Sequence, residues 1–183
     1  MAATSRGAGY FSSPYYHGFL YNGSTVIDLG TLGGNYSDAF GVSSNGLVTG
    51  QAQDSSGNYQ AYYTDANGTM HQIAAVPAGS TGYGINSSGQ VAGSSGDGTP
   101  FLYSGGVASN VNTLLATSGW TVTTVLRIND AGQMLAQAQN ASTGQSHAVL
   151  LTPFDASAVP EPASIGLFTI GSLGLFLISR KRK

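Results

Sequence analysis

An internal repeat constrains the fold of this 183-residue chain more than any other feature. Three similar segments stand 43 residues apart: GVSSNG at 41–46, GINSSG at 84–89 and RINDAG at 127–132. A short β-like run follows each of them. An aromatic or aliphatic landmark also recurs along the chain, as HGFLY at 17–21, QAYY at 60–63, TPFLY at 99–103 and HAVLL at 147–151. A repeat of this length is one supersecondary unit, which has to stack on its neighbours to bury its apolar faces.

The content of one period predicts four strands. In the first unit we expect strands at 18–21, 25–29, 39–43 and 47–52, with turns at Asn22-Gly23, Gly33-Gly34 and Asn45-Gly46. Asn-Gly and Gly-Gly supply the positive φ of tight hairpins, and no body segment keeps a helical period. The pattern predicts an all-β, propeller-like array of about three four-stranded antiparallel units. The array is incomplete, because propellers usually have four to eight blades.

The same pattern divides the chain. Residues 1–16 are a remnant of a preceding repeat or a disordered start, 17–154 form the β-repeat domain, and 155–162 are a linker that ends in a Pro-Glu-Pro motif. Because three units do not close, we expect exposed sheet edges that pair with missing blades or with another chain.

The C-terminus has the three parts of a membrane-sorting segment. Residues 163–179 carry no charge, and as a helix they would span about 25 Å, slightly less than a hydrocarbon core of ~30 Å. We therefore predict a transmembrane helix at 163–179 and a basic cytoplasmic stop at 180–183. The motif residues are Val159, Pro160, Glu161 and Pro162, and the stop residues are Arg180, Lys181, Arg182 and Lys183.

The motif, the apolar run and the basic end, in this order, resemble the PEP-CTERM sorting signal of Gram-negative bacteria that make extracellular polysaccharide. The resemblance implies export, membrane anchoring of the precursor, and processing near the motif by a membrane-embedded exosortase. It implies nothing about activity. The alternative is an ordinary C-terminal anchor that is never processed.

The body carries a second resemblance. The segment VIDLGTLGG at 26–34, between HGFLY at 17–21 and GVSSNG at 41–46, is similar to the HAF repeat of bacterial extracellular proteins. Later units replace its centre with Met70-His71-Gln72-Ile73 and with VNTLL at 111–115. The resemblance spans about 17–151. It implies a propeller-like fold and leaves catalysis unaddressed.

Charge and leader analysis bear on location and partners. Of six Lys and Arg residues, four lie at the C-terminus, so only Arg6 and Arg127 remain against the eight acidic residues of the chain. A nucleic-acid groove is therefore not expected. Cysteine is absent, which excludes disulfides and thiolate sites. Export requires an N-terminal signal, which residues 1–16 do not provide, so we favour an incomplete reading frame over a protein that is not exported.

No catalytic or metal constellation is visible, and we expect neither an enzyme nor a cofactor. His17 and His147 occupy equivalent repeat positions, which favours a structural role, and His71 has no evident acid partner. Segments 54–58 and 65–68 are read as ordinary turns rather than calcium loops, since neither has the full set of ligands. The acids are scattered, mostly in or beside turns: Asp28, Asp38, Asp54, Asp65, Asp97 and Asp130.

The sequence predicts a non-enzymatic, exported cell-envelope or extracellular-matrix protein that reaches the cell surface or the medium after exosortase processing. The alternative is an extracellular polysaccharide-binding module, since the body is rich in tyrosine and polar turns, and exposed rings can stack on sugars. A hydrolase assembled from distant carboxylates ranks third.

Overall fold

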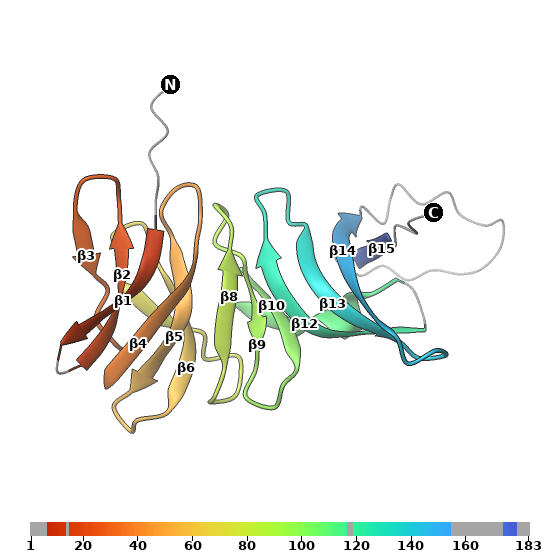
Figure 1. Ribbon diagram of the computed structural model, residues 1–183, viewed down its shortest axis with the longest axis horizontal. Coiled ribbons are helices and arrows are strands. Elements are labelled where there is room, and N and C mark those ends of the chain that lie inside the picture. Colours follow the sequence, from red (N-terminus) through yellow and green to blue (C-terminus); the bar gives the residue numbers. More distant parts are fainter. Residues whose placement is uncertain (1–6, 14, 117–118, 155–173, 179–183) are drawn as a thin grey trace.

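The structure is a computed structural model that describes residues 7–13, 15–116, 119–154 and 174–178. These residues form four antiparallel sheets, which Figure 1 shows side by side along the long axis of the molecule. The first sheet has three strands, β1 (Gly7–Ser13), β2 (Tyr15–Tyr21) and β3 (Val26–Asp28). The second has four: β4 (Gly33–Val42), β5 (Val48–Asp54), β6 (Tyr59–Thr64) and β7 (Met70–Gln72).

The third and fourth sheets repeat this meander. The third contains β8 (Thr81–Ile85), β9 (Val91–Ser94), β10 (Pro100–Ser104) and β11 (Val107–Asn110). The short 3₁₀ helix η1 (Val111–Leu114) leads to the fourth, with β12 (Trp120–Ile128), β13 (Met134–Asn140), β14 (Ser146–Phe154) and β15 (Gly174–Ile178). The predictions of an all-β fold and of a body almost without helix are confirmed for the described residues, and these sheets form an open row rather than a closed ring.

The boundaries between the sheets differ from the predicted boundaries between the repeat units. The four strands expected in one unit fall into two sheets, since β2 and β3 belong to the first and β4 and β5 to the second. A repeat period fixes the spacing of equivalent residues but not where a sheet begins. The crossover lies at 29–32, so the predicted turn at Gly33-Gly34 is wrong, and these glycines open β4.

One turn type closes most hairpins, and the glycine that ends each recurring six-residue segment belongs to it. Gly46, Gly89 and Gly132 have φ of 92°, 76° and 73°. Each donates its N–H to the carbonyl three residues earlier, and a second backbone bond closes the loop, as from Asn86 N to Gln90 O at 3.1 Å. Only glycine enters this left-handed region readily, so these positions hold the turn together.

The apolar core lies between sheets rather than within one. Ala61, Ile73 and Val76 of the second sheet region pack against Ile85, Val91 and Phe101 of the third. A larger cluster joins the third and fourth sheets, and a smaller one surrounds Tyr62 near the crossover from the first. The predicted need for stacking is thus met by buried side chains at each interface.

The predicted transmembrane helix at 163–179 lies mostly outside the described residues. Its described part is strand β15, which pairs antiparallel with β14 from Leu150 opposite Ile178 to Phe154 opposite Gly174. An apolar run can satisfy its backbone groups by pairing with an open sheet edge as well as by forming a helix. No helix in the described part of the chain has the length and apolar content that a membrane crossing needs.

Candidate functional site

The predicted sorting residues lie outside the part of the chain that the structure describes. This applies to Val159, Pro160, Glu161 and Pro162, and to Arg180, Lys181, Arg182 and Lys183. The structure therefore bears on the body, where sequence reasoning named no binding site. The first strands of three sheets, β4, β8 and β12, meet there.

These strands place equivalent repeat residues side by side. Gly41 of β4, Gly84 of β8 and Arg127 of β12 are 43 residues apart. A Cβ on Gly41 would lie 3.0 Å from Tyr83 O, and one on Gly84 would lie 2.9 Å from Arg127 Cα. The two glycines thus allow three strands from successive sheets to approach through their backbones. We call the line along which they meet the repeat axis.

The turns that follow these strands bond to one another across the repeats. Asn45 Nδ2 donates to Ser87 O at 3.0 Å, and Asn86 Nδ2 donates to Asn129 O at 3.1 Å. Asp130 accepts from Ser87 N at 2.8 Å and from Ser44 Oγ at 2.9 Å, so it joins turns that are 86 residues apart. The amide and hydroxyl of Ser87, together with the Ser44 hydroxyl, hold the pKa of Asp130 below its ordinary value. These bonds link the three turns directly to one another.

A cavity of about 310 Å³ lies on the repeat axis. Its lining comes from the three first strands and comprises Phe40, Gly41, Val42, Gly84, Ile85, Arg127 and Ile128. Arg127 is the one Lys or Arg in the described part of the chain. Its Nη1 donates to Leu126 O at 2.8 Å and Tyr83 O at 3.1 Å. Sequence reasoning counted this arginine but did not recognise that it replaces the glycine of the repeat.

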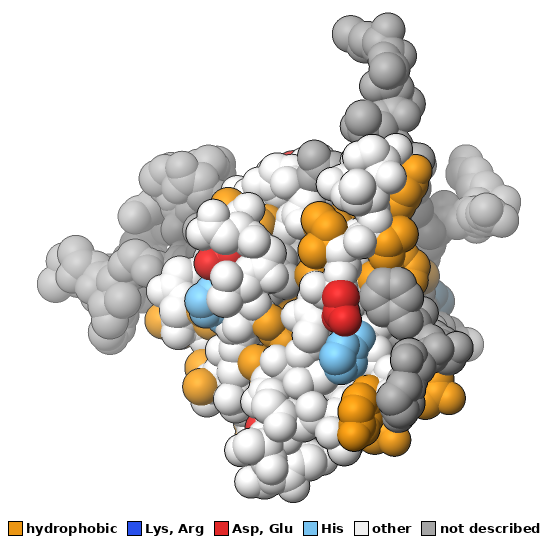
Figure 2. Space-filling view, turned by 90° about the vertical axis from the view of Figure 1, so that its left-hand side faces the viewer, with side chains coloured by type: hydrophobic (Ala, Val, Ile, Leu, Met, Phe, Trp, Pro, Cys, Tyr) orange, Lys and Arg blue, Asp and Glu red, His pale blue; other side chains and the backbone are white. Residues whose placement is uncertain are grey.

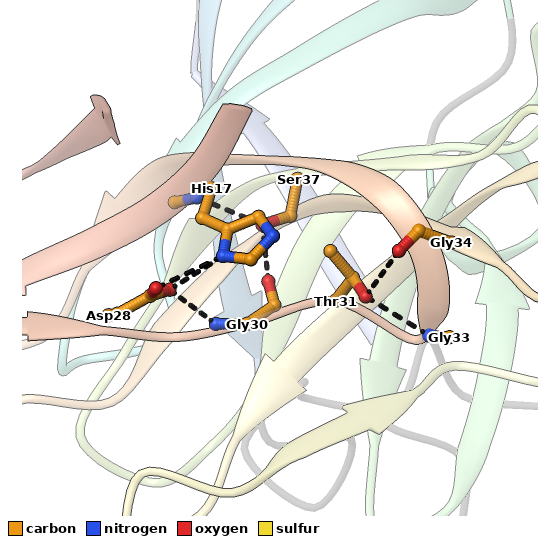
Figure 3. Close-up of polar contacts among 8 residues, drawn as sticks. His17, Asp28, Gly30, Thr31, Gly33, Gly34 and Ser37 are labelled. Carbon is orange, nitrogen blue, oxygen red and sulfur yellow. Dashed lines mark hydrogen bonds and ion pairs between the residues drawn. The ribbon is translucent and has the colours of Figure 1, made fainter. Parts of the chain in front are cut away.

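His17 takes part in the crossover between the first two sheets, and Figure 3 shows its surroundings. His17 Nδ1 lies 3.0 Å from both carboxylate oxygens of Asp28, and Gly30 N donates to Asp28 Oδ1 at 2.8 Å. Burial raises the pKa of Asp28, but the Gly30 amide and the His17 ring outweigh it, so this pKa lies below its ordinary value. Thr31 Oγ1 accepts from Gly33 N and donates to Gly34 O.

Serine residues link successive sheets in the same way twice. Ser37 Oγ accepts from Gly18 N at 2.9 Å and donates to Gly30 O at 2.5 Å. Ser80 Oγ, 43 residues later, accepts from Ala61 N at 2.8 Å. The crossover at 29–32 thus connects β3 to β4, and Asp28, Gly30 and Thr31 hold it by local hydrogen bonds.

The other histidines also have specific neighbours. The expectation that His71 lacks an acid partner is wrong, because His71 Nε2 lies 3.1 Å from Asp65 Oδ2. The hairpin between β6 and β7 brings the two side chains together, which sequence distance alone did not reveal. The ring of His147 meets Trp120 edge-on, with centroids 5.4 Å apart. Among the described residues no three His, Asp or Glu side chains gather as metal ligands.

The acidic loops expected to be ordinary turns have that structure. Asp54 Oδ1 accepts from Ser56 N and Asn58 N, and Asp65 Oδ1 accepts from Asn67 N and Thr69 N, all at 2.9–3.0 Å. Their carboxylates are thus occupied by local backbone amides.

The first sheet ends the row with a face that carries exposed apolar side chains, which Figure 2 shows as orange groups beside an acid and a histidine. The exposed fractions are 51% for Tyr15, 52% for Val26 and 41% for Ile27. Tyr62, in contrast, is fully buried, so the tyrosines divide between surface and core.

Comparison with known families gives one match. Residues 158–183 match the PEP-CTERM protein-sorting motif. This motif indicates a protein that is exported and processed by an exosortase. No curated protein and no solved structure matches the chain.

Proposed function

We propose that this chain is a non-enzymatic cell-envelope or extracellular-matrix protein whose C-terminal segment directs its membrane anchoring and exosortase processing. The observation that carries the proposal is the match of the sorting motif to residues 158–183. The match covers Pro160-Glu161-Pro162, the uncharged run at 163–179 and the four basic residues in the order that the signal requires.

In the precursor, the run at 163–179 enters the membrane and residues 180–183 remain on the cytoplasmic side. Lipid offers no hydrogen-bonding partner, so the backbone N–H and C=O groups of this segment have to bond to one another, as they do in a helix. This arrangement requires residues 174–178 to leave β14, and processing near the motif then releases the body.

For the body, we propose a propeller-like array of HAF-type repeats that serves as a structural module. Three features support it: the 43-residue stacking of equivalent turns, the repeated serine links between sheets, and the use of 26–34 as a connector. A non-enzymatic role agrees with the local partners of His17 and His71, since each pairs with an aspartate of its own hairpin.

Two changes to the signal test this function in cells that contain the exosortase. Glu161→Ala, or deletion of residues 180–183, should leave full-length precursor in the membrane fraction, as seen by immunoblot against the body. Asp155→Asn, a charge change outside the motif, is the matched control and should be processed normally. Normal release of both signal variants would refute the proposed sorting function.

A second candidate function is polysaccharide binding by the body. The cavity at the repeat axis favours this candidate. Its lining includes one cationic side chain, Arg127, and one exposed aromatic ring, Phe40, and these two groups suit a polar, ring-shaped ligand such as a sugar. Affinity electrophoresis of the released protein tests this candidate, and migration unchanged by every polysaccharide would reject it.

A further inference from the structure

Arg127 breaks the repeat at the point where the sheets meet. The equivalent positions hold Gly41 and Gly84, and each of those glycines faces the backbone of the next first strand. Arg127 has the third position, on β12, and its side chain lines the cavity. A long cationic side chain thus replaces a hydrogen atom in a cavity that successive first strands build together.

The charge of Arg127 has no opposite charge paired with it in the part of the chain that the structure describes. No carboxylate within the described ranges forms an ion pair with it, since the two ion pairs found there are His17–Asp28 and His71–Asp65. Asp130, three residues along, is held by Ser44 and Ser87. Both hydrogen bonds of the guanidinium use Nη1, so they fix its position while Nε and Nη2 keep their donors.

The other side chains that line the cavity are apolar, and one of them is an aromatic ring, whereas Arg127 and the strand backbones supply its polar surface. Phe40 is 42% exposed, and its ring lies 6.3 Å from that of Tyr83 at 40°. Val42, Ile85 and Ile128 complete the apolar lining. At about 310 Å³, the cavity has the size of a small ligand site, for which ~300 Å³ is the lower end.

We infer that this cavity binds a carboxylate-bearing sugar, a uronic acid unit, with Arg127 as the anion-binding group and Phe40 as the stacking face. The guanidinium fork matches the two oxygens of a carboxylate, and the C–H face of a pyranose ring matches an exposed aromatic ring. The inference rests on the proposed polysaccharide-binding function and specifies the acidic class of sugar within it.

The test measures binding of sodium glucuronate, glucose and sodium sulfate to the full chain in detergent by NMR titration. Glucuronate should bind more tightly than glucose, and Arg127→Met should weaken it about tenfold or more, because a charge-assisted bond is lost. Arg127→Lys should retain part of the affinity for glucuronate. Phe40→Leu should lower the affinity for glucuronate while leaving the affinity for sulfate unchanged. Asp97→Asn, a charge change in the turn at Asp97–Thr99, is the control and should bind as the unchanged protein does.

Three results would overturn the inference. They are equal affinity for glucose and glucuronate, unchanged glucuronate binding by Arg127→Met with an unchanged unfolding temperature, and sulfate binding as tight as that of glucuronate. Electrophoresis through an acidic and a neutral polysaccharide separates this inference from the function on which it rests. Retardation by the neutral polymer alone would leave polysaccharide binding standing and reject the acidic site, whereas no retardation by either would reject both.

Discussion

Gly84→Ala tests the contact between successive sheets at the repeat axis. We expect it to destabilise the protein by about 2 kcal/mol, because the added methyl group meets the backbone of the next sheet. The added Cβ would lie 2.9 Å from both Arg127 Cα and Ile128 N, which are backbone atoms of a different sheet. A backbone cannot move aside as the end of a flexible side chain can. Overpacking of this kind costs ~1–3 kcal/mol, and we expect the upper half of that range.

A smaller effect acts in the opposite direction. Alanine restricts the unfolded chain more than glycine does, which stabilises the folded state by ~0.4–1 kcal/mol. Subtracting this from ~3 kcal/mol leaves about 2 kcal/mol, equivalent to a Tm lower by about 4–8 °C in a chain of this size.

Thermal unfolding followed by circular dichroism measures this change. Ser88→Ala, at an exposed position in the following turn, is the control and should shift Tm by no more than ~1 °C. If Gly84→Ala unfolds at the temperature of the unchanged protein, β8 and β12 do not approach as described, and the axis and its cavity lose their basis.

Three further predictions concern single side chains. Tyr62→Phe should leave stability unchanged or raise it by about 1 kcal/mol in urea unfolding, because the buried Tyr62 hydroxyl has no partner among the described residues; a loss above ~1 kcal/mol would reveal a partner. Asp130→Ala should accelerate hydrogen exchange at the Ser87 amide, and unchanged exchange would contradict the link between turns. His71 and backbone amides lower the pKa of Asp65 in the folded protein. The ionised Asp65 therefore stabilises the fold above about pH 4, and this stabilisation is lost as the pH falls through the folded pKa. Asp65→Asn should weaken the acid dependence of Tm, and an unaltered pH profile of Tm would refute this prediction.

The strand content and turns could be predicted from the sequence because their causes are local. The glycine that ends each six-residue segment allows the positive φ that the turn requires, and Gly46, Gly89 and Gly132 all have it. The division into sheets could not be read from the period. A usable signal was present, since 29–32 lacks an Asn-Gly hairpin turn and instead carries the crossover into β4.

The cavity was missed because it depends on contacts between residues 43 apart. Arg127 was noticed only as one of two cations in the body, although aligning it with Gly41 and Gly84 would have marked it as exceptional. The partner of His71 was missed for a similar reason. The turn between β6 and β7 brings Asp65 next to it, and neither residue type predicts that pairing alone.

The intact mass of the released protein is the most direct test of the proposed sorting function. We predict that protein recovered from the cell surface or medium lacks the run at 163–179 and the basic residues through Lys183, and that cells without the exosortase keep the full-length C-terminus. A released protein that still ends at Lys183 would contradict it.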